Sequence, residues 1–152
     1  MLHNKFLVTL VALSLPLFSL PASAGGTEEF ANYSVHYNAL PTDQLSPAVA
    51  SAYGIVRSKN RALLNVAITR KVEKSAGIPV EGNIKVAVSN LTGQVKNMTL
   101  RKVEEKGEVT AIYYLGETNV ADGEILLFEI SVTPEGSTET LQIKFQQQFF
   151  AK

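Results

Sequence analysis

The chain has 152 residues, with 14 basic and 14 acidic side chains, two histidines, no cysteine and no tryptophan. The length leaves room for one domain, and a formal net charge of zero argues against a general nucleic-acid-binding protein, which needs a basic excess. The missing cysteine excludes a disulfide, a thiol nucleophile and a thiolate metal site, so the stability of the fold has to come from packing.

Residues 1–24 have the build of a secretory signal peptide. Lys5 supplies a positive charge, residues 6–20 are almost wholly apolar, and Ala22 and Ala24 put small residues at positions −3 and −1 of a cut after Ala24. The apolar stretch is shorter than the roughly 20 residues of a membrane-spanning helix, and Pro16 interrupts it. We therefore expect an exported protein whose mature chain, residues 25–152, is a single domain with no stable membrane insertion after cleavage.

From residue 25 on, apolar and polar residues alternate with a period of two, which is typical of half-buried antiparallel strands. Seven such runs are centred on residues 33–37, 64–68, 84–88, 98–101, 109–115, 126–132 and 141–145. Glycines lie between runs, and at Lys106-Gly107 and Asp122-Gly123 we expect the glycine to take a positive φ in a tight hairpin. The pattern predicts an all-β fold, an immunoglobulin-like antiparallel β-sandwich of about seven strands, with an open barrel as the alternative.

One segment, residues 40–61, breaks the alternation between the first two strands. Ser46 and Pro47 are typical of a helix N-cap followed by proline at the first helical position. A short helix over residues 48–53, ended by Gly54, is therefore expected in this crossover. A connection of that length is either functional or a cover for one end of the sandwich.

The end of the crossover carries the most distinctive cluster of cations, Arg57, Lys59 and Arg61, with Asn60 between them and Tyr53 upstream. Guanidinium groups match a carboxylate or phosphate in bidentate geometry. On an extended backbone the three cations share one face and form a positive stripe. The competing interpretation is a solvated strand end, where charge deters edge-to-edge aggregation.

Catalytic residue types are scarce in the mature chain. His36 is its one histidine, and the two aspartates, Asp43 and Asp122, both fall in turn-like sequence. A catalytic histidine needs a nucleophile and an orienting carboxylate, and a metal site needs several ligands at fixed spacing; neither pattern is present. We expect no enzyme activity, no metal and no cofactor, with a hydrolase centred on His36 as the last-ranked alternative.

Charge is uneven along the chain. Residues 57–106 contain 11 basic and 4 acidic side chains, a net charge of +7, whereas residues 107–152 contain 2 basic and 7 acidic ones, a net charge of −5. Two complementary faces would follow if each block formed its own surface, but strands distant in sequence interleave in a sandwich.

The stretches 33–39, 52–61 and Leu64-Asn65 resemble a family of small exported proteins of Gram-negative bacteria, domain of unknown function 4426. The likeness extends over the whole mature chain, and the run Tyr-Gly-Ile-Val-Arg-Ser-Lys-Asn-Arg at residues 53–61 is its specific part. The resemblance implies a periplasmic location. It supplies no activity, cofactor, substrate or catalytic residue.

These observations favour a non-enzymatic periplasmic β-sandwich that binds a partner protein or an envelope component, and not nucleic acid. The expected binding residues are Arg57, Lys59, Asn60 and Arg61, with Tyr53, His36 and Asn38 nearby. The alternative is a carrier or sensor of a small anionic ligand held by the same cluster.

Overall fold

A computed structural model describes residues 25–152, so the predicted signal peptide lies outside the described residues. Within this range no helix is long and apolar enough to cross a bilayer. The elements in chain order are β1 (Gly25–Glu29), β2 (Tyr33–Pro41), a 3-10 turn (Thr42–Gln44), α1 (Pro47–Ala52), β3 (Arg61–Arg70), β4 (Ile78–Pro79), β5 (Gly82–Asn90), β6 (Val95–Lys96), β7 (Arg101–Glu105), β8 (Ala111–Asn119), β9 (Ile125–Pro134) and β10 (Leu141–Gln148).

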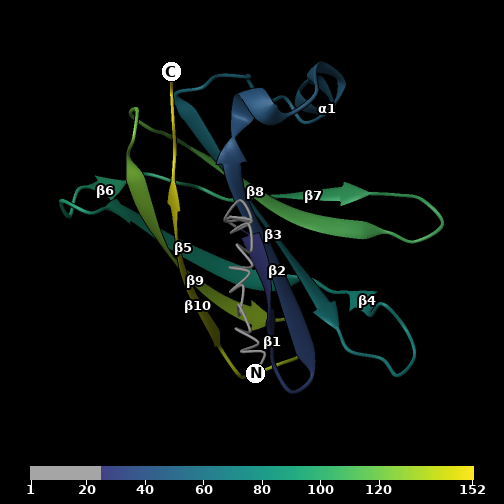
Figure 1. Ribbon diagram of the computed structural model, residues 1–152. Helices are drawn as coiled ribbons and strands as arrows, with labels where there is room; N and C mark the ends of the chain where they lie inside the picture. The colour runs from purple at the N-terminus through teal and green to yellow at the C-terminus, as the bar shows by residue number, and fades with distance from the viewer. Residues whose placement is uncertain (1–24) are drawn as a thin grey trace, which may run out of the picture.

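Two antiparallel sheets pack face to face (Figure 1). The larger sheet has the order β1-β2-β3-β8-β7, with β4 paired to β3, and the smaller sheet has the order β10-β9-β5-β6. The predicted all-β sandwich with a short helix in the first crossover is confirmed. The described chain has ten strands: six correspond to predicted runs, and β1, β4, β6 and β7 are further strands of two to five residues that the alternation did not reveal.

The predicted strand over residues 98–101 is wrong. Residues 97–100 connect β6 in the smaller sheet to β7 in the larger sheet, and the strand begins at Arg101. The side chains of Met98 and Leu100 pack on the core, over Gly116 of β8, where a Cβ atom would lie 2.7 Å from each of them. Alternation of apolar residues marks an extended segment with one buried side, and a crossing between sheets satisfies that pattern as well as a strand does.

The two predicted glycine turns differ. Gly123, between β8 and β9, has the expected positive φ of 73°, whereas Gly107, between β7 and β8, is not in the positive-φ region. The connection between β7 and β8 comprises residues 106–110. A loop of that length does not need the positive φ angles of a two-residue hairpin, so the expectation at Gly107 is wrong.

The core lies between the inner faces of the sheets. Phe128 of β9 stacks on Phe145 of β10, and Phe145 in turn packs against Tyr37 of β2, each pair with ring centroids 4.7 Å apart. The buried Tyr114 of β8 accepts a hydrogen bond from the backbone N–H of Gly82 at 3.0 Å, which satisfies its hydroxyl across the sandwich.

The crossover folds as its sequence predicts and packs on the outside of the larger sheet. The hydroxyl of Ser46 accepts from the N–H of Val49 at 3.2 Å, Pro47 occupies the first turn of α1, and Gly54 follows with a φ of 65°. In Figure 1 α1 lies beyond the end of β2. The crossover residues Ala50 and Ile55 form a second apolar cluster with Leu63 of β3 and Leu115 of β8.

Thr42 ties the two ends of the crossover together. Its side chain is fully buried, and its hydroxyl accepts from the N–H of Ser58 at 2.8 Å and lies 2.9 Å and 3.1 Å from the carbonyl oxygens of Val56 and Ser58. At the other end of the helix, the guanidinium of Arg101 donates to the carbonyl of Tyr53.

Replacing Thr42 by valine keeps the shape of the side chain and leaves buried backbone groups of the crossover without their partner. We expect the substitution to lower the free energy of unfolding by about 1–3 kcal/mol. Urea denaturation measures this loss, with Thr42→Ser as the matched control that keeps the hydroxyl. A larger loss for serine than for valine would show that the methyl group, and not the hydrogen bonds, holds the crossover.

Candidate binding groove

A hollow of about 390 Å³ lies between the crossover and the outer face of the larger sheet; we call it the outer-face groove. It is lined by Asn38, Leu40, Leu45, Val49, Tyr53, Ile55, Leu63, Asn65, Tyr113 and Leu115. Its volume is within the range of small-molecule sites, about 300–1,000 Å³, and such sites combine apolar walls with a few polar groups.

Strand alternation builds the floor of the outer-face groove and the crossover builds its wall. Asn38 of β2 pairs with Asn65 of β3, and Asn65 pairs with Leu115 of β8, so these three side chains stand in one row on the outer face. Val49 and Tyr53 come from α1 and its C-cap and close the other side.

Asn65 carries the unusual polar atom of the outer-face groove. Its side-chain oxygen is buried and has no hydrogen-bond partner. An unpaired buried acceptor of this kind costs about 1–3 kcal/mol of stability, and such atoms are rare in folded proteins. A bound molecule that brings an N–H or O–H group next to this buried oxygen would satisfy it.

The outer face continues from the outer-face groove towards His36. A second hollow of about 260 Å³ shares Asn38, Asn65 and Tyr113 with it and is also lined by His36. The imidazole of His36 lies between two hydroxyls, with Nδ1 2.9 Å from Thr27 Oγ1 and Nε2 3.1 Å from Thr69 Oγ1. Both ring nitrogens are thus already engaged by the protein.

A third hollow is lined by both His36 and the carboxylate-bearing Glu29. This carboxylate pairs with Lys71 at 2.7 Å and accepts from the hydroxyl of Ser34 at 2.9 Å, and these contacts lower the pKa of Glu29. A catalytic histidine is oriented by a carboxylate on one ring nitrogen. In this hollow the carboxylate is bonded to Lys71 and Ser34, and the ring of His36 is held by threonines.

The cationic side chains of the crossover lie outside the outer-face groove. Arg57 donates to the carbonyl of Asp43 at 2.8 Å, and Lys59 donates to the carbonyl of Lys152 at 2.8 Å. Residues 58–61 form a turn, closed by a hydrogen bond from Arg61 N–H to the Ser58 carbonyl, so the extended positive stripe does not form.

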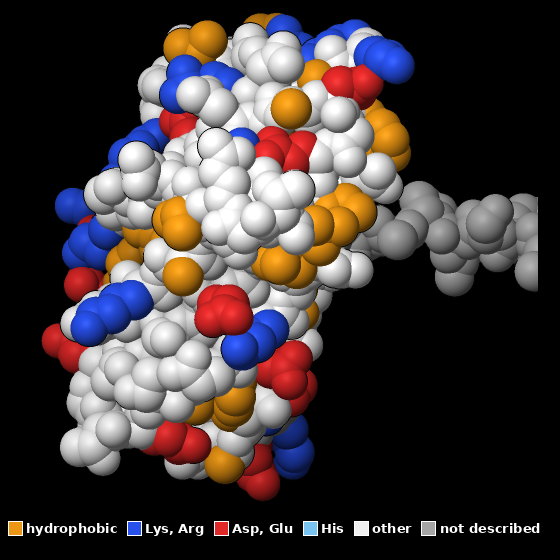
Figure 2. All heavy atoms as spheres, turned by 90° about the vertical axis from the view of Figure 1, so that its left-hand side faces the viewer, with side chains coloured by type: hydrophobic (Ala, Val, Ile, Leu, Met, Phe, Trp, Pro, Cys, Tyr) orange, Lys and Arg blue, Asp and Glu red, His pale blue; other side chains and the backbone are white. Residues whose placement is uncertain are grey.

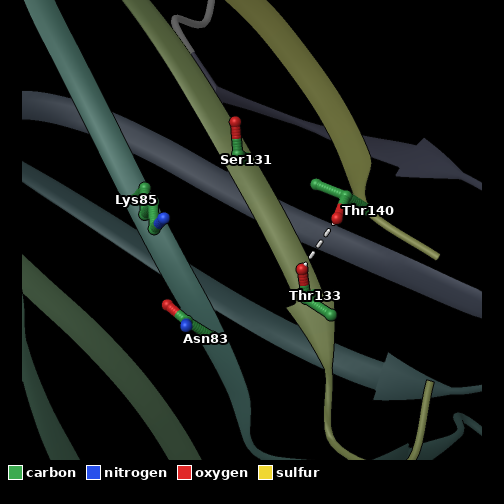
Figure 3. Close-up of a pocket in the computed structure, with 5 residues that line it drawn as sticks. All are labelled: Asn83, Lys85, Ser131, Thr133 and Thr140. Carbon is green, nitrogen blue, oxygen red and sulfur yellow. Dashed lines mark hydrogen bonds between the residues drawn. The ribbon is translucent and has the colours of Figure 1, made fainter. Parts of the chain in front are cut away.

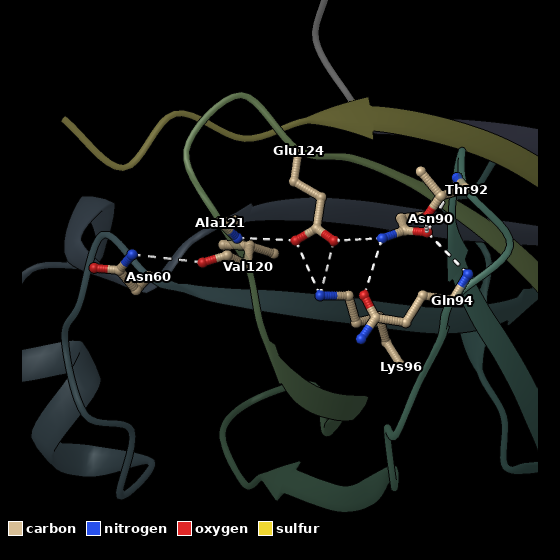
Figure 4. Close-up of polar contacts among 8 residues, drawn as sticks. All are labelled: Asn60, Asn90, Thr92, Gln94, Lys96, Val120, Ala121 and Glu124. Atoms are coloured by element: carbon tan, nitrogen blue, oxygen red, sulfur yellow. Dashed lines mark hydrogen bonds and ion pairs between the residues drawn. The ribbon is translucent and has the colours of Figure 1, made fainter.

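Arg61 and Asn60 do not line the outer-face groove. The Nε atom of Arg61 lies 3.4 Å from Glu117 of β8, and Arg61 lines a polar hollow with Lys96 of β6. The side-chain amide of Asn60 donates to the carbonyl of Val120 at 3.5 Å (Figure 4). Of the predicted binding residues, the structure thus brings Asn38, Tyr53 and His36 to the outer face and disperses the four of the basic segment.

Next to Val120, a half-enclosed ion pair joins β6 to the loop before β9 (Figure 4). Lys96 and Glu124 lie 2.8 Å apart, with side chains 16% and 11% exposed, and Glu124 also accepts from Asn90 and from the N–H of Ala121, each at 2.8 Å. Burial acts to raise the pKa of Glu124, but the hydrogen bonds from Lys96, Ala121 and Asn90 outweigh it and hold the pKa below its ordinary value.

Acidic and basic side chains mix on the surface. The ion pairs Arg61–Glu117 and Lys96–Glu124 each join the basic block of the sequence to the acidic block. Blue and red side chains are intermixed on the face seen in Figure 2. The fold thus joins the two blocks of the sequence at these ion pairs.

The outer face of the smaller sheet has a different character. A hollow of about 240 Å³ is lined by Asn83, Lys85, Ser131, Thr133 and Thr140, and the two threonine hydroxyls lie 2.9 Å apart (Figure 3). All five side chains are polar, and hydroxyls and amides of this kind are well solvated. This shallow polar surface is what the alternation predicts for the solvent side of an antiparallel sheet. Among residues 25–152, no group of three or more His, Asp or Glu side chains is placed to hold a metal ion.

Most of the lining of the outer-face groove escaped the sequence analysis. Leu63, Asn65, Tyr113 and Leu115 fall in predicted strands but were not assigned to a site, and Asn65 also belongs to the family resemblance. A signal was present, because Leu63-Leu64 and Tyr114-Leu115 put large apolar residues on both faces of neighbouring strands. Apolar residues on an outer face require a cover.

Comparisons with known proteins give the following relationships. The family model for the domain of unknown function DUF4426 matches residues 27–152. A crystal structure of a DUF4426 family protein from Pseudomonas aeruginosa PAO1 is similar to this chain, with 32% sequence identity and a TM-score of 0.69 over 85% of this chain and 97% of that one. Among curated proteins, no sequence matches this chain.

The lowered pKa of Glu124 predicts acid sensitivity. Its contribution to stability is complete above the ordinary value of 4.5 and is lost as the pH falls through the lower folded-state pKa. Glu124→Gln should therefore be less stable at neutral pH and should lose less stability on acidification, as measured by urea unfolding at pH 7 and pH 3. Glu104→Gln, which breaks the exposed pair with Lys102, is the control and should change the pH dependence less.

The unpaired oxygen of Asn65 predicts a stabilising substitution. Asn65→Leu replaces the buried acceptor by an apolar group of similar size and should raise the free energy of unfolding by about 1 kcal/mol. Asn38→Leu, at the paired and exposed position of β2, should stay within about 0.5 kcal/mol. A loss of stability in the Asn65 variant would mean that this oxygen is already satisfied in solution.

Proposed function

The chain belongs to the DUF4426 family, and we propose that it is an exported, non-enzymatic β-sandwich protein that binds an envelope component in the outer-face groove. The observation that carries the proposal is the apolar hollow between the crossover and the sheet, with the unpaired, buried oxygen of Asn65 at its floor. A fold stabilised by packing alone has no structural use for such an atom, and concave apolar sites with a few polar groups are the usual form of ligand sites.

Export is supported by the pattern of residues 1–24 and by the resemblance to exported proteins. The absence of catalysis is supported by the surroundings of His36, whose ring nitrogens contact Thr27 and Thr69, while Glu29 is engaged by Lys71 and Ser34. A periplasmic location follows from the same proposal.

The groove replaces the basic segment as the binding surface in this proposal. Arg57 and Lys59 direct hydrogen bonds to backbone carbonyls of Asp43 and Lys152, which uses part of their capacity to bind an anion. Asn38 and Tyr53, which the sequence already indicated, line the groove itself. A partner protein recognised by the cations of the segment is the competing interpretation.

The two surfaces are distinguished by amide chemical-shift mapping of the isotope-labelled protein during titration with solubilised envelope material. We expect shifts at groove residues, led by Leu63, Tyr113 and Leu115. Val49→Glu puts a charge at a position of the groove that is 41% exposed, and it should weaken the interaction at least about tenfold, because a charge there has no counter-ion.

The matched control is Val109→Glu, at a 72% exposed position in the turn between β7 and β8, which should bind as the parent does. The double variant Arg57→Ala and Arg61→Ala should also bind normally with a nearly unchanged thermal midpoint. Shifts confined to residues 57–61, and lost in the double variant, would move the site to the basic segment and contradict the proposal.

A further inference from the structure

The lining of the outer-face groove is chemically specific enough to define its ligand. Resting on the proposed function, we propose that the groove binds a neutral amphiphile, a molecule with one apolar chain or ring system and one N–H or O–H donor, and discriminates against carboxylates and other anions. Three features of the groove carry this inference.

The first feature is the lack of any ion among the lining side chains. Eight of the ten residues are aliphatic or aromatic, and the other two are the neutral amides Asn38 and Asn65. The nearby cations have other contacts, because Arg101 donates to the carbonyl of Tyr53 and Arg57 donates to the carbonyl of Asp43. A carboxylate or sulfonate entering the groove would lose water without gaining a counter-charge, which disfavours charged ligands.

The second feature is the polarity of the unpaired atom. The buried side-chain oxygen of Asn65 accepts hydrogen bonds and donates none. A ligand that brings one donor therefore removes an existing penalty, whereas a ligand with acceptors alone leaves that penalty in place. This makes the donor a condition of tight binding and sets the orientation of the ligand, with its polar end towards the row formed by Asn38 and Asn65.

The third feature is size and shape. The volume of about 390 Å³ is in the lower part of the range for small-molecule sites. Leu45, Val49 and Ile55 of the crossover face Leu63 and Leu115 of the sheet, so apolar surfaces border the hollow on two sides. These dimensions suit one chain or a small aromatic system.

A pair of fluorescent probes that differ in charge tests the proposal. N-phenyl-1-naphthylamine is neutral and has one N–H donor, and 8-anilino-1-naphthalenesulfonate has the same ring system and donor with an added sulfonate. With the exported protein we expect the neutral probe to bind at one site per chain, with a dissociation constant at least about tenfold lower than that of the sulfonate. Equal or tighter binding of the sulfonate would overturn the proposal.

The role of the donor is tested by competition with three molecules of equal chain length at pH 8. Decanol, which has a donor, should displace the neutral probe, whereas decyl methyl ether, which is neutral without a donor, and decanoate, which is charged, should do so about tenfold less well. Equal displacement by all three would show that the groove selects for neither charge nor donor, and would overturn the inference.

Asn65 is tested directly by substitution. Asn65→Leu should leave the protein folded and weaken binding of decanol by about tenfold, while leaving that of decyl methyl ether unchanged. The control is Asn83→Leu in the polar hollow of the smaller sheet, which should bind as the parent does (Figure 3). Unchanged decanol binding in the Asn65 variant would show that this side chain does not recognise the ligand.

The envelope titration and the probe experiment together separate the inference about the ligand class from the proposed function of the groove. If envelope material shifts the amides of Leu63 and Leu115 but the neutral probe does not bind, the ligand class is wrong and the groove remains the site. If neither envelope material nor probe reaches these residues, both proposals fail.

Discussion

The structure depends on one constraint: the central strands of the larger sheet are apolar on both faces. Leu64 and Tyr114 face the smaller sheet and are buried in the core, whereas their neighbours Leu63 and Leu115 face outward. A two-layer sandwich buries one face of each sheet. The outward side chains would remain in water unless a further segment covered them, and the crossover between β2 and β3 is that segment.

The cover is held by polar contacts at its ends and leaves a hollow between them. Thr42 binds the backbone of residues 56 and 58, and Arg101 holds the end of α1 through Tyr53. With both ends anchored, the helix of six residues does not fill the whole outer face. The outer-face groove is therefore a consequence of how the cover is attached, and its floor contains Asn65, which stands between Asn38 and Leu115 in the cross-strand row.

Charged side chains form ion pairs elsewhere in the molecule and do not line the outer-face groove. Ion pairs such as Lys96–Glu124 and Arg61–Glu117 join segments outside the lining of the outer-face groove. Their main effect is to fasten loops and to spread charge of both signs over the surface. A basic run in a sequence suggests an anion site, but hydrogen bonds to backbone carbonyls give the same side chains a local structural role.

Local patterns in the sequence were sufficient to predict the all-β architecture and the helix of the crossover. A period of two reports which side of a strand is buried. The pair Ser46-Pro47 starts a helix because the Ser46 hydroxyl accepts from the N–H of Val49 and proline fits the first helical turn. The same patterns also placed Asn38 and Tyr53 among the candidate site residues.

Tertiary structure alone decided the rest. Residues 97–100 cross from one sheet to the other and do not form a strand, which their local pattern could not reveal. The row of Asn38, Asn65 and Leu115 was set by the register between three strands. The dispersal of Arg57, Lys59 and Arg61 depended on partners up to 93 residues away in the chain. Strand pairing and burial bring together residues that no local sequence pattern relates. The outer-face groove, with the unpaired oxygen of Asn65 beside apolar side chains, is therefore a property of the folded chain.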